Sequence, residues 1–413
     1  MRNRKIRAAV VATILFSALQ MTGACAQDSA SKGNSARPEV GKPVQAAIDL
    51  IRGKKGKEAM ARLREAQAVR DRTPYENYLI ERVLGQVAIM NGDPATAARA
   101  LEAAAASPAG PEAEKRQLLA AAAGQYYQAK DYRKAAEIAE RHFAAGGTDR
   151  SLRAILIQSL YLSNNFSAAI KLLSADIDAE ERGGQVPSEN QLQLLANAYL
   201  QQKDNTGYTR AMERLVSHYP KRDYWLVLLQ AIPTRPGYSD KLALDVARLK
   251  IATETMGTTE EYVEAAQLAL QDGFPKEALK IIEVGYAAGR LGTGAEATRH
   301  QRLKDMAAKN HAEDLKASAK DESQPAGREG KVLFNEGFNN VLNGKTEKGL
   351  AMMEQGIRMG SGFTRPEQAK LQLGYAYHLA GQDSKAVQVY RTAQGTDGTS
   401  TIAKLWITRL SRR

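Results

Sequence analysis

The segment KLQLGYAYHLAGQDSKAVQVYRTA, Lys370 to Ala393, decides the fold. Its apolar residues recur at intervals of three and four, which indicates amphipathic helices. Gly381 separates two such stretches, so the segment predicts two helices joined by a tight turn. The small residues Gly374 and Ala386 allow the two helices to cross closely, because a larger side chain in a packed crossing costs roughly 1 to 3 kcal/mol of strain.

The same pattern recurs upstream at intervals of 34 to 39 residues. One marker residue, equivalent to Ala386 in the second helix, identifies each of ten units. The markers are Ala59, Ala97, Ala135, Ala169, Tyr208, Ala243, Ala278, Ala312, Gly349 and Ala386. Leu84 and Gly85 precede the turn residue Gly92 at the spacing with which Leu373 and Gly374 precede Gly381. A fixed period over more than 300 residues predicts a helical repeat array.

Bulk composition agrees with a helical chain. The 413 residues are 43% hydrophobic and 25% charged, with only 6% aromatic residues and abundant alanine. Alanine favours helices, and no window shows sustained alternation of β-branched residues. We therefore predict an all-α chain.

The repeating unit resembles the tetratricopeptide repeat family, whose unit of about 34 residues is an antiparallel helix pair. The resemblance covers Val44 to Ala393. It implies a right-handed superhelical solenoid of about 8 to 10 repeats, in which each pair buries its apolar faces against its neighbours. It also implies that the first helices of the pairs line the concave face, where a partner would bind.

The N-terminus has the pattern of a secretory signal peptide. Four basic residues precede an apolar run from Ala8 to Leu19, and small residues surround Cys25. We expect cleavage after Ala26 and a periplasmic or secreted protein. The alternative is a lipoprotein anchored through Cys25. After cleavage no cysteine and no disulfide would remain. Of the formal charge of +12, the four leader residues carry +4, so +8 would remain.

Composition predicts the remaining boundaries. Residues 27–43 are polar and carry two prolines, which predicts a flexible linker. We expect an N-terminal array at 44–320, a hinge at 321–331 and further repeats at 332–394. Residues 395–413 are expected to form an amphipathic capping helix with a basic tail, membrane contact by this helix being the alternative.

The sequence contains no motif for catalysis. Its five histidines lack metal-ligand spacing, and no HExxH, paired CxxC or GxSxG pattern occurs. Gly344-Lys345-Thr346 lacks the upstream glycine of a phosphate-binding loop and follows a helix rather than a strand. We predict no catalytic residue, no metal site and no cofactor, and hence no enzymatic activity.

The tetratricopeptide resemblance places particular residues on the partner-binding face. They share first-helix positions and are rich in amides and aromatic rings, which suit an extended peptide backbone. These residues are Arg82, Gln86, Gln117, Tyr127, Gln158, Tyr161, Gln193, Asn197, Phe338, Tyr375 and His378.

These features predict a scaffold that holds a protein or peptide partner in the bacterial cell envelope. Nucleic acid is not an expected partner, and no transmembrane helix is expected in the mature chain. An alternative function is binding of envelope glycans such as peptidoglycan, because amides and aromatic rings also suit sugars.

Overall fold

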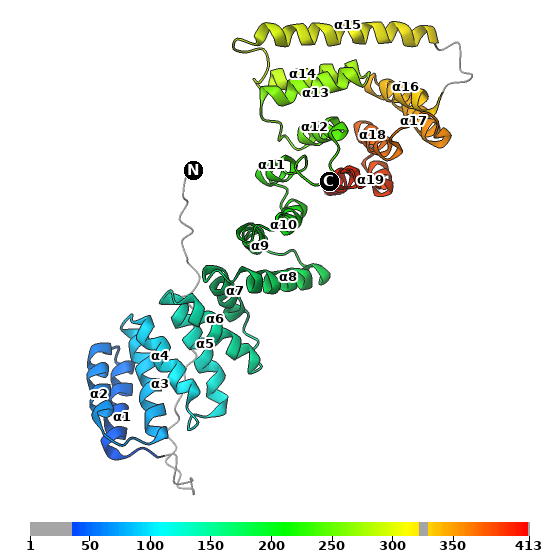
Figure 1. The fold of residues 1–413 in the computed structure, drawn as a ribbon. Coiled ribbons are helices and arrows are strands. Elements are labelled where there is room, and N and C mark those ends of the chain that lie inside the picture. The colour runs from blue at the N-terminus through cyan, green and yellow to red at the C-terminus, as the bar shows by residue number, and fades with distance from the viewer. Residues whose placement is uncertain (1–34, 322–328, 412–413) are drawn as a thin grey trace. The chain divides into compact units, whose positions relative to one another are not determined.

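The computed structural model describes residues 35–321 and 329–411, where it contains twenty α-helices, one short 3-10 helix and no strand (Figure 1). The all-α prediction is therefore confirmed. The chain forms two compact units, one ending at Ser159 and the other beginning at Leu160. The predicted signal peptide, the start of the predicted linker, most of the predicted hinge and the last two residues lie outside the described residues.

In its described residues, the first unit contains six complete helices and the first part of a seventh. They are α1 (Pro38–Arg52), α2 (Gly56–Ala68), α3 (Pro74–Met90), α4 (Pro94–Ala106), α5 (Glu112–Gln128), α6 (Tyr132–Ala144) and α7 (Arg150–Leu162), and the border falls within α7. From α1 to α6, each helix packs against the next one in the chain.

The second unit continues with α8 to α20. Its helices are α8 (Phe166–Arg182), α9 (Glu189–Gln201), α10 (Asn205–His218), α11 (Arg222–Gln230), η1 (Asp240–Leu242), α12 (Ala243–Ala252), α13 (Thr259–Gln271), α14 (Pro275–Ala287), α15 (Ala297–Asp321), α16 (Gly330–Leu342), α17 (Thr346–Met359), α18 (Pro366–Leu379), α19 (Asp383–Thr392) and α20 (Thr399–Leu410).

Local chemistry explains why these segments form helix pairs. In the α3–α4 pair, Thr73 and Glu76 form a capping box at the start of α3. The chain turns at Gly92, whose φ of +71° favours glycine. Asp93 then caps α4 by accepting a hydrogen bond from the Thr96 N–H at 3.0 Å. Two helices joined by such a short turn must pack antiparallel.

The predicted register is confirmed in eight of the ten units. In each of these, a residue with φ between +57° and +84° stands five positions before the marker, and the second helix begins three positions before it. The eight turn residues are Lys54, Gly92, Lys130, Asn164, Lys203, Gly273, Gly344 and Gly381. The described chain is therefore built largely from TPR-like helix pairs.

Two predicted units differ from this pattern. Ala243 is the first residue of α12 rather than its fourth, because the chain between α11 and α12 forms an irregular loop and η1. Ala312 lies inside α15, a single helix of 25 residues, so the helix pair predicted there is wrong. The α15 sequence contains no glycine or proline that could break the helix into two.

The start of the array is also earlier than predicted. Helix α1 begins at Pro38, six residues before the expected boundary at Val44. A proline at the first helical position fits because its missing N–H has no partner in the helix there. Pro43, the last residue of the predicted linker, also lies inside α1. Residues 38–43 are therefore helical and do not belong to a flexible linker.

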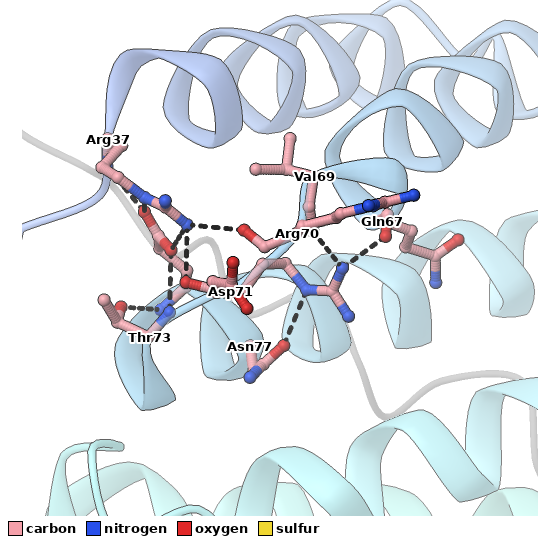
Figure 2. Close-up of polar contacts among 9 residues, drawn as sticks. Arg37, Gln67, Val69, Arg70, Asp71, Thr73 and Asn77 are labelled. Atoms are coloured by element: carbon pink, nitrogen blue, oxygen red, sulfur yellow. Dashed lines mark hydrogen bonds and ion pairs between the residues drawn. The ribbon is translucent and has the colours of Figure 1, made fainter.

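Arg37 ties this helix to the next pair (Figure 2). Its backbone N–H and its guanidinium donate to the Glu76 carboxylate at 2.8 to 2.9 Å, and the guanidinium also donates to the Asp71 carbonyl at 3.0 Å. Glu76 is fully buried. The hydrogen bond from Arg37 lowers the pKa of Glu76 to about 2, although desolvation acts in the opposite direction.

The C-terminal segment predicted to cap the array forms one helix, α20, with its apolar face buried. Ile402, Leu405, Trp406 and Leu410 of α20 are buried. These are the apolar residues that would contact a membrane in the alternative prediction, and here they pack inside the protein. Besides α18 and α19, α20 contacts α10 and α12. The C-terminal helices therefore return to helices more than 150 residues upstream, which a simple stack of repeats does not do.

Candidate partner-binding surface

In the first unit, two predicted binding residues from neighbouring pairs lie together. The Tyr127 hydroxyl of α5 donates to Oε1 of Gln158 on α7 at 2.6 Å. The Tyr127 ring packs edge-on against Tyr132, with 5.5 Å between centroids. Desolvation raises the pKa of Tyr127, so the hydroxyl stays protonated and remains a donor at neutral pH. Tyr127 is half-buried and Gln158 is exposed, so both are accessible.

The other predicted residues of this unit differ in accessibility. Gln86 on α3 and Gln117 on α5 are exposed. Arg82 is largely buried, and its Nε lies 3.2 Å from the Glu114 carboxylate, which also accepts the Tyr78 hydroxyl at 2.5 Å. Arg82 therefore joins α3 to α5. Gln86 and Gln117 are therefore accessible, whereas Arg82 forms a structural ion pair with Glu114.

In the second unit, Gln193 on α9 is engaged as well. Its amide donates to the Tyr224 hydroxyl of α11 and to the Glu189 carboxylate. Glu189 also accepts from Lys221 at 2.6 Å. Asn197 is exposed, and Tyr161 is half-buried with its ring edge-on to Phe166 at 5.4 Å. Asn197 and Tyr161 are accessible, whereas Gln193 is part of a structural network.

The C-terminal members of the predicted site do not form an open surface, so the prediction is wrong for Phe338. Its ring is fully buried and packs against Phe274 at 4.8 Å and Tyr375 at 6.3 Å. Burial raises the pKa of Tyr375. His378 is largely buried too, with Nδ1 at 2.7 Å from Asp383 Oδ1 and its ring 5.3 Å from Trp406.

A buried arginine explains this difference. Arg248 on α12 bonds Glu277 through Nε and Nη2 at 2.8 and 2.7 Å, and Asp245 through Nη1 at 2.9 Å. Its guanidinium lies 5.2 Å from the Phe338 ring centroid and 5.1 Å from that of Tyr375, as in cation–π pairs. The rings predicted to bind a partner therefore cover a charge from the same chain.

Polar contacts between residues far apart in sequence surround this cluster. Gln368 on α18 donates to the Asp245 carboxylate at 3.0 Å, and Arg409 on α20 donates to the Ala252 carbonyl at 3.1 Å. The Ser239 N–H donates to the Asp397 carbonyl at 2.9 Å. Desolvation raises the pKa of Asp245, while Arg248 acts to lower it. Within the second unit, the C-terminal helices thus contact α10 and α12 directly.

Sequence reasoning missed Arg248 entirely. The repeat pattern singles out only the marker Ala243 in the segment LALDVARLK, five residues before Arg248. One signal was available, because Arg248 stands four residues after Leu244 and three before Ile251, on one apolar helix face. A charge in that position indicates either an error of register or a buried ion pair.

Neither a metal site nor a membrane span is present in the described parts of the chain. No group of three or more His, Cys, Asp or Glu residues there could hold a metal ion. No helix among the described residues has both the length and the apolar composition needed to cross a bilayer.

No family model and no curated protein matches the chain. Among solved structures, the complex of Naa15/Naa10 bound to HypK-THB aligns with 14% identity and a TM-score of 0.31, covering 87% of this chain and 58% of that one. The yeast Tom70 crystal structure aligns with 11% identity and a TM-score of 0.25, covering 88% of this chain and 94% of that one. At these scores the helix pairs described above, and not the alignments, establish the TPR-like fold.

Proposed function

We propose that this protein is a non-enzymatic, exported scaffold of the bacterial cell envelope that holds a segment of a partner protein. The repeat fold supports a binding role, since stacked helix pairs present extended surfaces. The signal-peptide pattern of residues 1–26 supports export.

The accessible amide and tyrosine side chains of the first unit carry the proposal. Gln86, Tyr127 and Gln158 come from first helices of successive pairs, and the Tyr127–Gln158 hydrogen bond holds two of them in place. Exposed amides can donate to and accept from an extended peptide backbone. A tyrosine held in one rotamer adds contact area with little further loss of entropy.

The second unit contributes less to this surface. Phe338 is fully buried, and Tyr375 and His378 are half-buried against Arg248 and Trp406, so these side chains are already engaged within the chain. We therefore place partner docking on the first unit and regard Tyr161 and Asn197 as the accessible residues of the second.

The test is an affinity capture from envelope extract with residues 27–413 as bait. A Gln86→Ala, Tyr127→Ala, Gln158→Ala variant is compared with an Arg133→Ala, Glu140→Ala control, whose changes lie at exposed positions of α6. A protein retained by the wild type and the control, but lost by the first variant, supports the proposal. Equal capture by all three contradicts it, and retention on cell-wall polysaccharide instead would favour glycan binding.

A further inference from the structure

The turn between α1 and α2 is strongly basic. Residues 52–57 read RGKKGK, and Arg52, Lys54, Lys55 and Lys57 are all exposed. With Glu58, the segment 52–58 carries a net charge of +3. Lys54 adopts the left-handed conformation at φ +57°, which fixes the direction of the chain at the tip of the turn. The positive charge therefore lies on an exposed turn of defined backbone conformation.

Little of this charge is neutralised locally. Arg52 pairs with Asp49 at 3.3 Å and Lys55 with Glu58 at 3.5 Å, both as exposed pairs within one helical turn. Such exposed pairs are weak. Lys54 and Lys57 form no ion pair within the described residues. The equivalent turns before α4, α6 and α10 each place an aspartate where this turn has Lys55.

An apolar side chain borders the basic turn. Met90, at the end of α3, is 37% exposed, and its sulfur lies 3.1 Å from the position that a Cβ on Gly56 would take. The Asn91 amide donates to the Gly56 carbonyl at 3.2 Å and so fixes the turn against α3. The surface thus combines four cations with an exposed thioether on a rigid support.

We propose that this surface, composed of Arg52, Lys54, Lys55, Lys57 and Met90, binds the headgroup region of an anionic lipid bilayer. Clustered cations gain from the negative surface potential of such a membrane, and an adjacent apolar side chain can enter the interface. Nucleic acid is the less suitable polyanion, because the turn has no aromatic side chain on which a base could stack. The proposal is independent of the partner held by Gln86, Tyr127 and Gln158.

The test is co-sedimentation of residues 27–413 with vesicles, without any protein partner. Vesicles of phosphatidylglycerol and phosphatidylcholine should bind the protein, and binding should weaken as salt is raised. Each cation at an anionic surface contributes about fivefold in partitioning, so Lys54→Gln, Lys55→Gln, Lys57→Gln should reduce partitioning on the order of one hundredfold. Met90→Gln should cause a smaller reduction at all salt concentrations.

The matched control removes three cations elsewhere in the first unit. Lys115→Gln, Arg116→Gln, Arg150→Gln lowers the net charge by the same amount at the beginnings of α5 and α7. Equal loss in both triple variants would show a non-specific effect of net charge and overturn the proposal. So would equal binding to vesicles of phosphatidylcholine alone, or a preference for a single-stranded oligonucleotide over the anionic vesicles.

Discussion

Helices α16 and α17 cross so closely that only glycine fits at their contact. Gly330 and Gly337 on α16 face Gly356 and Gly349 on α17. A Cβ added to Gly337 would lie 2.6 Å from the Gly349 carbonyl oxygen and 2.8 Å from the Met353 backbone nitrogen. These obstacles are backbone atoms, so no change of rotamer relieves the clash.

The change is Gly337→Ala, and two effects oppose each other. Replacing a helical glycine by alanine would gain about 1 kcal/mol of helix propensity. The clash requires α16 and α17 to separate along a contact that includes both glycine pairs. Overpacking of this kind costs about 1 to 3 kcal/mol, and more where backbone must move. Because the obstacles are backbone atoms, the upper end of that range applies, and after subtraction of the gain in helix propensity we expect a net loss of about 2 kcal/mol in the free energy of unfolding of the second unit.

The assay is urea unfolding followed by circular dichroism, with Gly124→Ala as the matched control. Gly124 lies in α5, where an added Cβ has no heavy atom within 4 Å beyond its own helix and chain neighbours. That control should raise the stability of the first unit by about 0.5 to 1 kcal/mol. If Gly337→Ala is as stable as the wild type, or gains stability as Gly124→Ala does, the close backbone contact between α16 and α17 is refuted.

Three further predictions concern charges and turns. Since Glu76 has a pKa lowered to about 2 against an ordinary 4.5, its stabilising effect is complete above about pH 4.5 and is lost as the pH falls toward 2. Because Arg37 is partly exposed, solvent screens part of its effect on Glu76, and Arg37→Ala should abolish that part of the acid dependence in pH-dependent unfolding of the first unit. Arg248→Met leaves two buried carboxylates without their cation and should cost about 3 to 5 kcal/mol in chemical denaturation. The exposed change Arg302→Met in α15 should be neutral, and equal stability of the two variants would contradict the buried network. Lys203→Gly removes a lysine from the left-handed conformation and should raise the free energy of unfolding of the second unit, measured by thermal denaturation, by up to about 1 kcal/mol. The control Lys280→Gly, inside α14, should lower it by about the same amount. A loss in both variants would indicate that Lys203 has contacts that outweigh its backbone strain.

The sequence period predicted the helix pairs because the residues that recur are those needed within each single pair. A small residue at the helix crossing and a left-handed residue five positions earlier are both fixed by contacts within one pair. The pattern therefore placed the turns correctly even where lysine or asparagine replaces glycine. It failed at Ala312, because a spacing of 34 to 39 residues was extended across α15 without a turn residue to support it.

The binding surface was less predictable for a different physical reason. Exposure of first-helix side chains follows from the repeat only when each pair contacts its neighbours alone. The repeat pattern therefore located Gln86, Tyr127 and Gln158, which are exposed or half-buried. That condition does not hold for Phe338, because α16, α18 and α20 contact helices far upstream. No repeat period carries information about such contacts.

An aromatic residue on the inner face of a repeat can serve a partner or the chain's own core, and charge decides between them here. Burial of Arg248 beside two carboxylates costs desolvation free energy, and contact with aromatic ring faces offsets part of that cost for the cation. Phe338 and Tyr375 provide these ring faces, and Gln368 satisfies part of Asp245. Tyr127, by contrast, is half-buried, and its hydroxyl bonds the exposed amide of Gln158. The fold therefore fixes the position of the Tyr127 ring and still leaves part of it accessible, as our proposal of a docking role requires.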